Sequence, residues 1–111
     1  MRWMVFASVN LYEAVLRSGY PERFTSVPDA VEATRTAAVA RMGEALAVLE
    51  AAIDPGPFIL GATMSLADVY IAMLFTWYRG EIEAPRLAAL KDGVTQNAIV
   101  APIWRRHFGD Q

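Results

Sequence analysis

The sequence predicts an all-α fold, a helical bundle of about five helices that forms a single domain over residues 1–111. Apolar residues recur at spacings of three and four, the period of an amphipathic helix, and no stretch alternates with period two for long. Glycine and proline fall mainly between these periodic segments, where they interrupt regular structure. A chain of 111 residues is long enough to form one hydrophobic core without disulfide or metal support.

The bounds of the expected helices follow from the breaks between the periodic segments. The first helix stops before Gly19-Tyr20-Pro21, and the second begins near Pro28, a residue suited to a first helical turn. Asp54-Pro55-Gly56-Pro57 ends the second helix. We expect five helices over Arg2–Arg17, Pro28–Ile53, Ser65–Arg79, Pro85–Gly93 and Ala98–Phe108.

The first of these helices has two largely apolar faces, so we expect it to pack on two sides. One face holds Trp3, Phe6, Ala7, Asn10 and Ala14. The other face holds Val5, Ser8, Val9, Tyr12 and Leu16. From their spacing alone, Val5, Ser8 and Tyr12 are more simply interpreted as part of the core than as a binding surface.

The helix that begins at Ser65 is the most completely specified element. Ser65 is a favourable N-cap, and Asp68 stands three residues later, where the second side chain of a capping box belongs. Met64 and Val69 occupy the two positions of a hydrophobic staple. The rest of the helix is apolar on every side, which is typical of a core helix, so we expect it at the centre of the bundle.

Composition argues against several classes of function. Hydrophobic residues make up 55% of the chain, too many for a disordered protein. The net charge of -2 argues against a nucleic-acid partner. The longest strongly apolar run, residues 69–78, is half of the roughly 20 residues that span a membrane, so we expect no membrane partner. The absence of cysteine leaves no disulfide framework and fits the cytoplasm.

No catalytic or metal-binding constellation is visible. His107 is the only histidine and has no carboxylate at a ligand spacing, so we expect a solvent-exposed residue. Glu81 and Glu83 lie on an expected turn without a further acid or base nearby. Gly61 stands alone and cannot make a glycine-rich phosphate loop. We therefore predict no catalytic residue, no metal and no cofactor in this chain.

The segment around the Ser65 helix resembles a known family. It is similar to the "fLxGxxxSxAD" segment in the helical C-terminal half of cytosolic glutathione S-transferases, and the likeness extends to both sides. The matching residues are Arg2-Trp3-Met4-x-Phe6, Leu60-Gly61, Ser65, Ala67-Asp68, Tyr70-Ile71, Trp77, Pro85-x-Leu87 and Ala101-Pro102-Ile103-Trp104. Nothing resembles the thioredoxin-like N-terminal half, which in that family binds glutathione and carries the catalytic residue.

This resemblance implies a full-length enzyme that joins the glutathione thiolate to a hydrophobic electrophile, with glutathione as co-substrate. The helical half would supply the hydrophobic wall of the cleft, so Val5, Ser8, Tyr12 and Trp77 become candidate substrate-binding residues. Val5 and Tyr12 depart from some bacterial classes, which have Asn and His there. Because the groups that activate the thiolate belong to the other half, we expect this chain to be inactive alone. Whether it acts within an enzyme stays open at this point.

The resemblance also implies partners. It implies a homodimer formed by the first helix and the Pro28–Ile53 helix, with Trp3, Phe6 and Asn10 as contacts. It implies a thioredoxin-like glutathione-binding domain as a neighbour if the chain is part of a longer protein. The alternative is a non-catalytic assembly module of the same fold, of the kind found in translation factors and aminoacyl-tRNA synthetase complexes.

Overall fold

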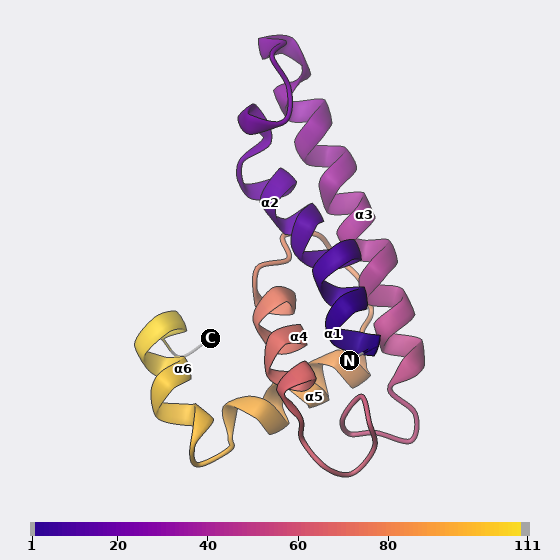
Figure 1. Cartoon of the computed structure of the whole chain (residues 1–111), viewed down its shortest axis with the longest axis vertical. Coiled ribbons are helices and arrows are strands. Elements are labelled where there is room, and N and C mark those ends of the chain that lie inside the picture. The colour runs from indigo at the N-terminus through magenta and orange to yellow at the C-terminus, as the bar shows by residue number, and fades with distance from the viewer. Residues whose placement is uncertain (1, 110–111) are drawn as a thin grey trace.

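The computed structural model describes residues 2–109, and they form an all-helical bundle (Figure 1). The chain begins with three consecutive helical segments, α1 (Arg2–Phe6), η1 (Ala7–Tyr12) and α2 (Glu13–Gly19), which make one continuous rod. Short 3₁₀ turns, η2 (Pro21–Arg23) and η3 (Pro28–Ala30), lead into the long helix α3 (Val31–Ala52). The rod and α3 run antiparallel as a hairpin that extends beyond the rest of the molecule.

Three shorter helices complete the fold. They are α4 (Leu66–Thr76), α5 (Pro85–Thr95) and α6 (Val100–Phe108). Helix α4 packs against α1, η1 and α5, whereas α6 is joined to the bundle mainly through α5 and stands to one side (Figure 1). In residues 2–109 the only β-type pairing is an isolated bridge between Phe58 and Gly61. The prediction of a five-helix all-α bundle is therefore confirmed, with the first helix divided into three segments.

The middle of the first rod departs from the expected helix. Residues Ala7–Tyr12 form a π-helix, in which hydrogen bonds join residues five apart and each residue turns through a smaller angle than in an α-helix. The spacing of Val5, Ser8 and Tyr12 therefore describes one face only approximately. Such π segments are frequent at functional sites, and this one contains two of the candidate binding residues, Ser8 and Tyr12.

The core lies between the rod, α3, α4 and α5. Met42, Leu46 and Leu49 are buried within α3, and Ile53 is buried directly after it. The buried core residues are Ala7, Leu11, Ala14, Met42, Ala45, Leu46, Leu49, Ile53, Ile59, Ile71, Ala72, Leu74, Ala84, Leu87, Leu90, Val94 and Trp104. Leu11 was assigned to neither apolar face, yet it is fully buried with Ala7 and Ala14. These three residues define the face of the rod that the core covers.

Helix α4 lies at the centre of the bundle, as the sequence predicted. It is not buried on every side, although its apolar residues surround it. Ile71, Ala72 and Leu74 are buried, whereas Leu66 is 80% exposed. The helix can bury only the sides that α1, η1 and α5 reach. The open side of α4 faces the same solvent region as the exposed face of the rod, where Ser8 meets Tyr70.

The capping box at the start of α4 is confirmed, and it extends further than predicted. Ser65 and Asp68 form the reciprocal arrangement, with the Ser65 backbone N–H donating to Asp68 Oδ2 at 2.7 Å. The second carboxylate oxygen, Oδ1, accepts the backbone N–H of Ile59 at 2.8 Å. Asp68 is completely buried, so its carboxylate needs these backbone donors in place of water.

Helix α5 is capped by a residue from another helix. Glu50 on α3 accepts the backbone N–H groups of Arg86 at 3.0 Å and Leu87 at 2.9 Å, both in the first turn of α5. The carboxylate satisfies two of the N–H groups that a helix start leaves free and lies at the positive end of the helix dipole. This contact joins the α1–α3 hairpin to the second half of the chain.

Candidate functional site

The side of the rod opposite the core is apolar and open to solvent. Val5 is 55% exposed, Val9 is 62% exposed and Tyr12 is 39% exposed. The core interpretation of this face is therefore wrong, because α3 and α4 cover only the side that holds Ala7, Leu11 and Ala14. Several exposed apolar side chains on adjacent turns are typical of a surface that contacts a ligand or another protein.

Ser8 and Tyr12 meet a residue of α4 that the sequence analysis did not select. The Ser8 hydroxyl lies 3.2 Å from the Tyr70 hydroxyl, and the rings of Tyr12 and Tyr70 have centroids 6.4 Å apart. The pair of hydroxyls lies at the surface, where it can still exchange hydrogen bonds with a ligand or water. Tyr70 was read as a core residue, although it belongs to the segment that carried the family resemblance.

A cavity of about 640 Å³ continues from this surface toward the α2 end of the hairpin. We call it the Tyr12 cavity, and its wall includes Tyr12, Leu16, Tyr20, Val39 and Trp77. Two of the four candidate substrate residues, Tyr12 and Trp77, are therefore brought to one cavity although they lie far apart in the sequence. Val5 and Ser8 are not in its lining and lie further along the rod.

A second cavity, of about 690 Å³, lies between α4 and α6. Its wall is formed by Val69, Met73, Ile103 and an aromatic group in which Phe108 contacts both Trp77 and Trp104. Trp77 and Arg79 line both cavities, so the two spaces adjoin at the end of α4. His107, exposed as predicted, also lines this second cavity.

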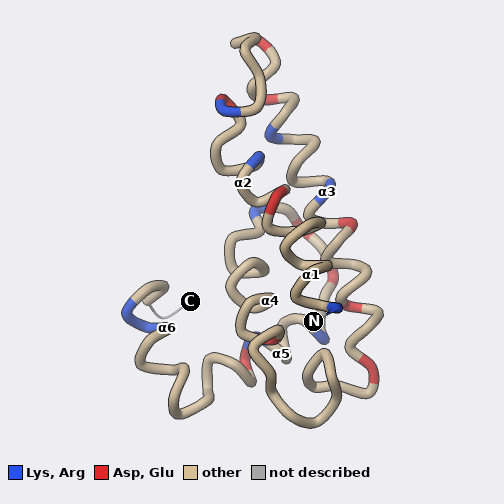
Figure 2. Tube along the Cα trace, viewed as in Figure 1, with Lys and Arg blue, Asp and Glu red and all other residues tan. Residues whose placement is uncertain are grey.

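The charges around the Tyr12 cavity come from two arginines that sequence reasoning did not select. Arg35 pairs with Glu32 and donates its Nε–H to the Ser18 backbone carbonyl at 3.3 Å. Arg79 makes no hydrogen bond or ion pair with any residue in the described range 2–109. Figure 2 shows charged residues along the hairpin, around α5 and on α6, whereas α4 has only Asp68.

The described residues contain no clustered groups for metal binding. Among residues 2–109 no group of three His, Cys, Asp or Glu side chains could hold a metal ion.

Tyr78 follows Trp77, and burial together with the nearby Glu81 carboxylate raises the pKa of its phenol, which keeps it protonated at neutral pH. No helix within the described range is long and apolar enough to cross a membrane.

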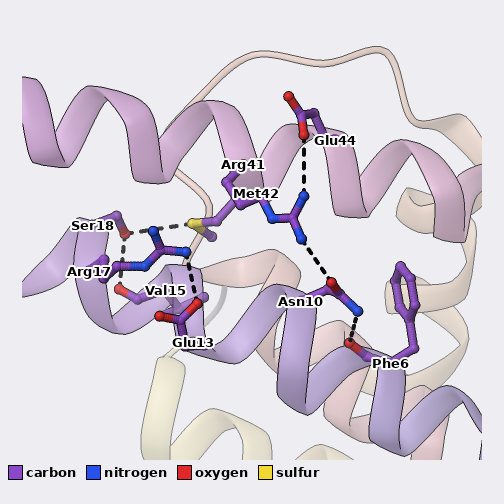
Figure 3. A network of polar contacts seen from close by, with 9 residues as sticks. All are labelled: Phe6, Asn10, Glu13, Val15, Arg17, Ser18, Arg41, Met42 and Glu44. Atoms are coloured by element: carbon purple, nitrogen blue, oxygen red, sulfur yellow. Dashed lines mark hydrogen bonds and ion pairs between the residues drawn. The ribbon is translucent and has the colours of Figure 1, made fainter.

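The expected dimer-contact residues lie on α1 and η1. Trp3 and Phe6 are half-buried, pack against the core and contact each other edge to face, with ring centroids 5.7 Å apart. Figure 3 shows Asn10 between the Phe6 carbonyl and Arg41, whose guanidinium donates to Asn10 Oδ1 at 2.9 Å. Part of the apolar surface of Trp3 and Phe6 is thus buried within this chain and is not available to a partner.

These features define a helical domain with an open apolar side, and comparison with known proteins identifies its class. The model of the family described as glutathione S-transferase, C-terminal domain, matches residues 32–108. This match covers more than half of the chain, so the protein belongs to that family. No curated protein and no solved structure matches the chain. The matched range excludes the first rod, so the place of Val5, Ser8 and Tyr12 is known only from the structure.

Proposed function

We propose that this chain is the helical half of a glutathione S-transferase-like protein and supplies the wall that contacts the hydrophobic substrate. The observation that carries this proposal is the solvent-open strip formed by Val5, Val9 and Tyr12, which leads into a cavity bounded by Trp77. Apolar walls with a few hydroxyl groups are the usual lining of small-molecule sites. Ser8 and Tyr70 supply those hydroxyl groups beside the strip.

The conjugation reaction requires a thiolate, which this chain does not provide. It has no cysteine, and glutathione would be held by a thioredoxin-like domain that covers the open strip. That domain would lower the pKa of the glutathione thiol and present the thiolate to the electrophile. The residues of this chain would bind and orient the electrophile and exclude water from it. The cytoplasm, where glutathione is abundant, is the location that suits this role.

A homodimer is the second part of this proposal. Arg41, Glu44 and Val48 share one face of α3, and Asn10 is bonded to the first of them, so together they form a continuous surface that we call the outer face. Val48 is 48% exposed on this surface. The outer face and the open strip share no residue, so a dimer formed through Arg41, Glu44 and Val48 would leave the strip free for the thioredoxin-like domain.

Binding and activity of the chain itself test the substrate-wall role. The unreactive compound dinitrobenzene should shift the NMR signals of Tyr12, Tyr70 and Trp77, and Tyr12→Ala should weaken this binding. The matched control is Leu60→Ala, which removes a 70% exposed side chain from a loop and should leave binding unchanged. With glutathione and chlorodinitrobenzene, the chain alone should show no conjugation above the uncatalysed rate.

Two results would contradict the proposal. Conjugation by the chain alone would place the thiolate-activating group in these residues. A lack of any shift at Tyr12 and Trp77, together with tight binding of another protein to the open strip, would favour the assembly module.

A further inference from the structure

The electrostatics of the Tyr12 cavity carry information about the class of substrate. Arg35 and Arg79 line the cavity wall, and no Asp or Glu does. Apart from Ser18 and Gly19, the rest of the wall is apolar or aromatic, with Tyr12 on η1 and Trp77 directly after α4. A site with cations and no anions on its wall favours a ligand of negative charge over a neutral one of the same shape.

The two arginines are not equivalent. The charge of Arg35 is balanced by Glu32, and its Nε–H is used by the Ser18 carbonyl. Arg79 follows α4 and makes no hydrogen bond or ion pair within the described range 2–109. Its five N–H donors are therefore free to bind a ligand, and a guanidinium matches the geometry of a carboxylate or sulfonate through two parallel hydrogen bonds.

The positions of the aromatic residues indicate the shape of the apolar part of the ligand. Trp77 lies two residues before Arg79, and Tyr12 lines the same cavity from the rod. The Tyr12 and Tyr70 rings are in contact, which holds Tyr12 at the cavity edge. A flat apolar body between Tyr12 and Trp77 would place an attached acid group near Arg79.

We infer that the Tyr12 cavity takes a flat, apolar molecule that carries a carboxylate or sulfonate, with Arg79 as the residue that binds the acid group. This inference rests on the proposed substrate-wall function and specifies the substrate class of the same site. Tyr12 and Trp77 contact the apolar body, and Arg79 selects for charge.

Naphthoate and naphthamide test the inference, because the two compounds share one aromatic body and differ in charge. Binding to the full chain is measured by calorimetry, and the site is located by the NMR signal of the Trp77 indole N–H, assigned with Trp77→Phe. We expect naphthoate to bind roughly fivefold more tightly than naphthamide, the upper range for a solvent-exposed ion pair. Added salt should reduce this preference, because ions screen exposed charges.

Arg79→Gln should remove the preference for naphthoate and leave the affinity for naphthamide unchanged. Arg106→Gln is the matched control, since Arg106 is also an exposed arginine but lies on α6 and lines neither cavity. It should change neither affinity.

The possible failures separate the inference from the proposed function. Equal affinity for the two compounds, or equal losses in Arg79→Gln and Arg106→Gln, would overturn the charge selection while the substrate-wall role remains. Absence of binding by both compounds at Trp77 would overturn the inference and the substrate-wall role together.

Discussion

The carboxylate of Asp68 accepts the backbone N–H of Ile59, nine residues earlier in the chain, at 2.8 Å. The same carboxylate accepts the N–H of Ser65 at 2.7 Å and the Ser65 hydroxyl at 3.1 Å. One buried side chain therefore fixes both the first turn of α4 and the loop that leads to it. Its contribution to stability should exceed that of an ordinary capping residue.

Variants of this capping box should lose stability unequally. Ser65→Ala should cost roughly 0.5–2 kcal/mol, the usual range for an N-cap. Asp68→Ala leaves two backbone donors without a partner at 1–3 kcal/mol each, so we expect a loss on the order of 3 kcal/mol. The double variant should lose less than the sum, because the two residues share one interaction. Urea denaturation measures all three, and strict additivity would contradict a coupled box.

Asp68→Asn keeps the size of the side chain and removes its charge and one acceptor oxygen, so it tests the hydrogen bonds without leaving a cavity. The amide keeps one acceptor oxygen but places an NH₂ group against either the Ile59 or the Ser65 donor. We expect a loss of about 1–3 kcal/mol, the cost of one unsatisfied buried donor. A variant as stable as the parent protein would mean that one of the two bonds contributes nothing.

The sequence predicted this box because its rules are local. Ser65, Asp68 and the apolar run after them lie within one or two turns, where residue identity determines conformation. The bond to Ile59 could not be predicted, since it depends on the path of the loop that brings residue 59 back to α4. The same holds for Glu50, whose role as a cap requires the packing of α3 against α5.

The candidate site was predicted only in part for the same reason. Tyr12 and Trp77 were named through the resemblance, and both line one cavity. Tyr70 and Arg79 were missed because periodicity cannot tell which side of a helix remains uncovered. The π-helix was also missed, since no residue pattern in the rod distinguishes it from an α-helix.

The cap that Glu50 supplies to α5 should be measurable as well. Glu50→Ala removes the acceptor for two N–H groups and should destabilise the protein by roughly 0.5–2 kcal/mol. Glu13→Ala is the control, because Glu13 forms only an exposed ion pair with Arg17 at 2.8 Å and is not part of the outer face. Thermal denaturation should show a clear decrease in Tm for the first variant and almost none for the second. Equal effects would contradict the capping role.

Two glycines at helical positions should respond differently to alanine. A Cβ atom at Gly93 on α5 would lie 2.9 Å from the Phe58 ring, whereas one at Gly19 would meet nothing within 4 Å. Gly19→Ala should therefore gain up to about 1 kcal/mol from helix propensity, and Gly93→Ala should lose that gain to the clash. Equal gains in urea denaturation would mean that Phe58 moves aside freely. Gly93→Ala measured in a Phe58→Leu background should recover the gain.

The association of the chain follows from its two uncovered surfaces. We expect a homodimer through α1 and α3, with Trp3, Phe6 and Asn10 among the contacts, and a charged residue at Phe6 should give monomer or aggregate. Phe6 is half-buried against the core of its own chain, so Phe6→Glu can also fail by unfolding. Val48→Glu is the sharper variant, since Val48 is 48% exposed on the outer face.

Val9→Glu completes the comparison, because Val9 is 62% exposed on the open strip and not on the outer face. In sedimentation experiments Val48→Glu should shift the protein to monomer, and Val9→Glu should leave the dimer intact. A reversed result would place the dimer on the strip that we assign to the substrate and the thioredoxin-like domain. A parent protein that stays monomeric at high micromolar concentration would contradict the dimer on either surface. The helical half would then have only its cleft side as an interface.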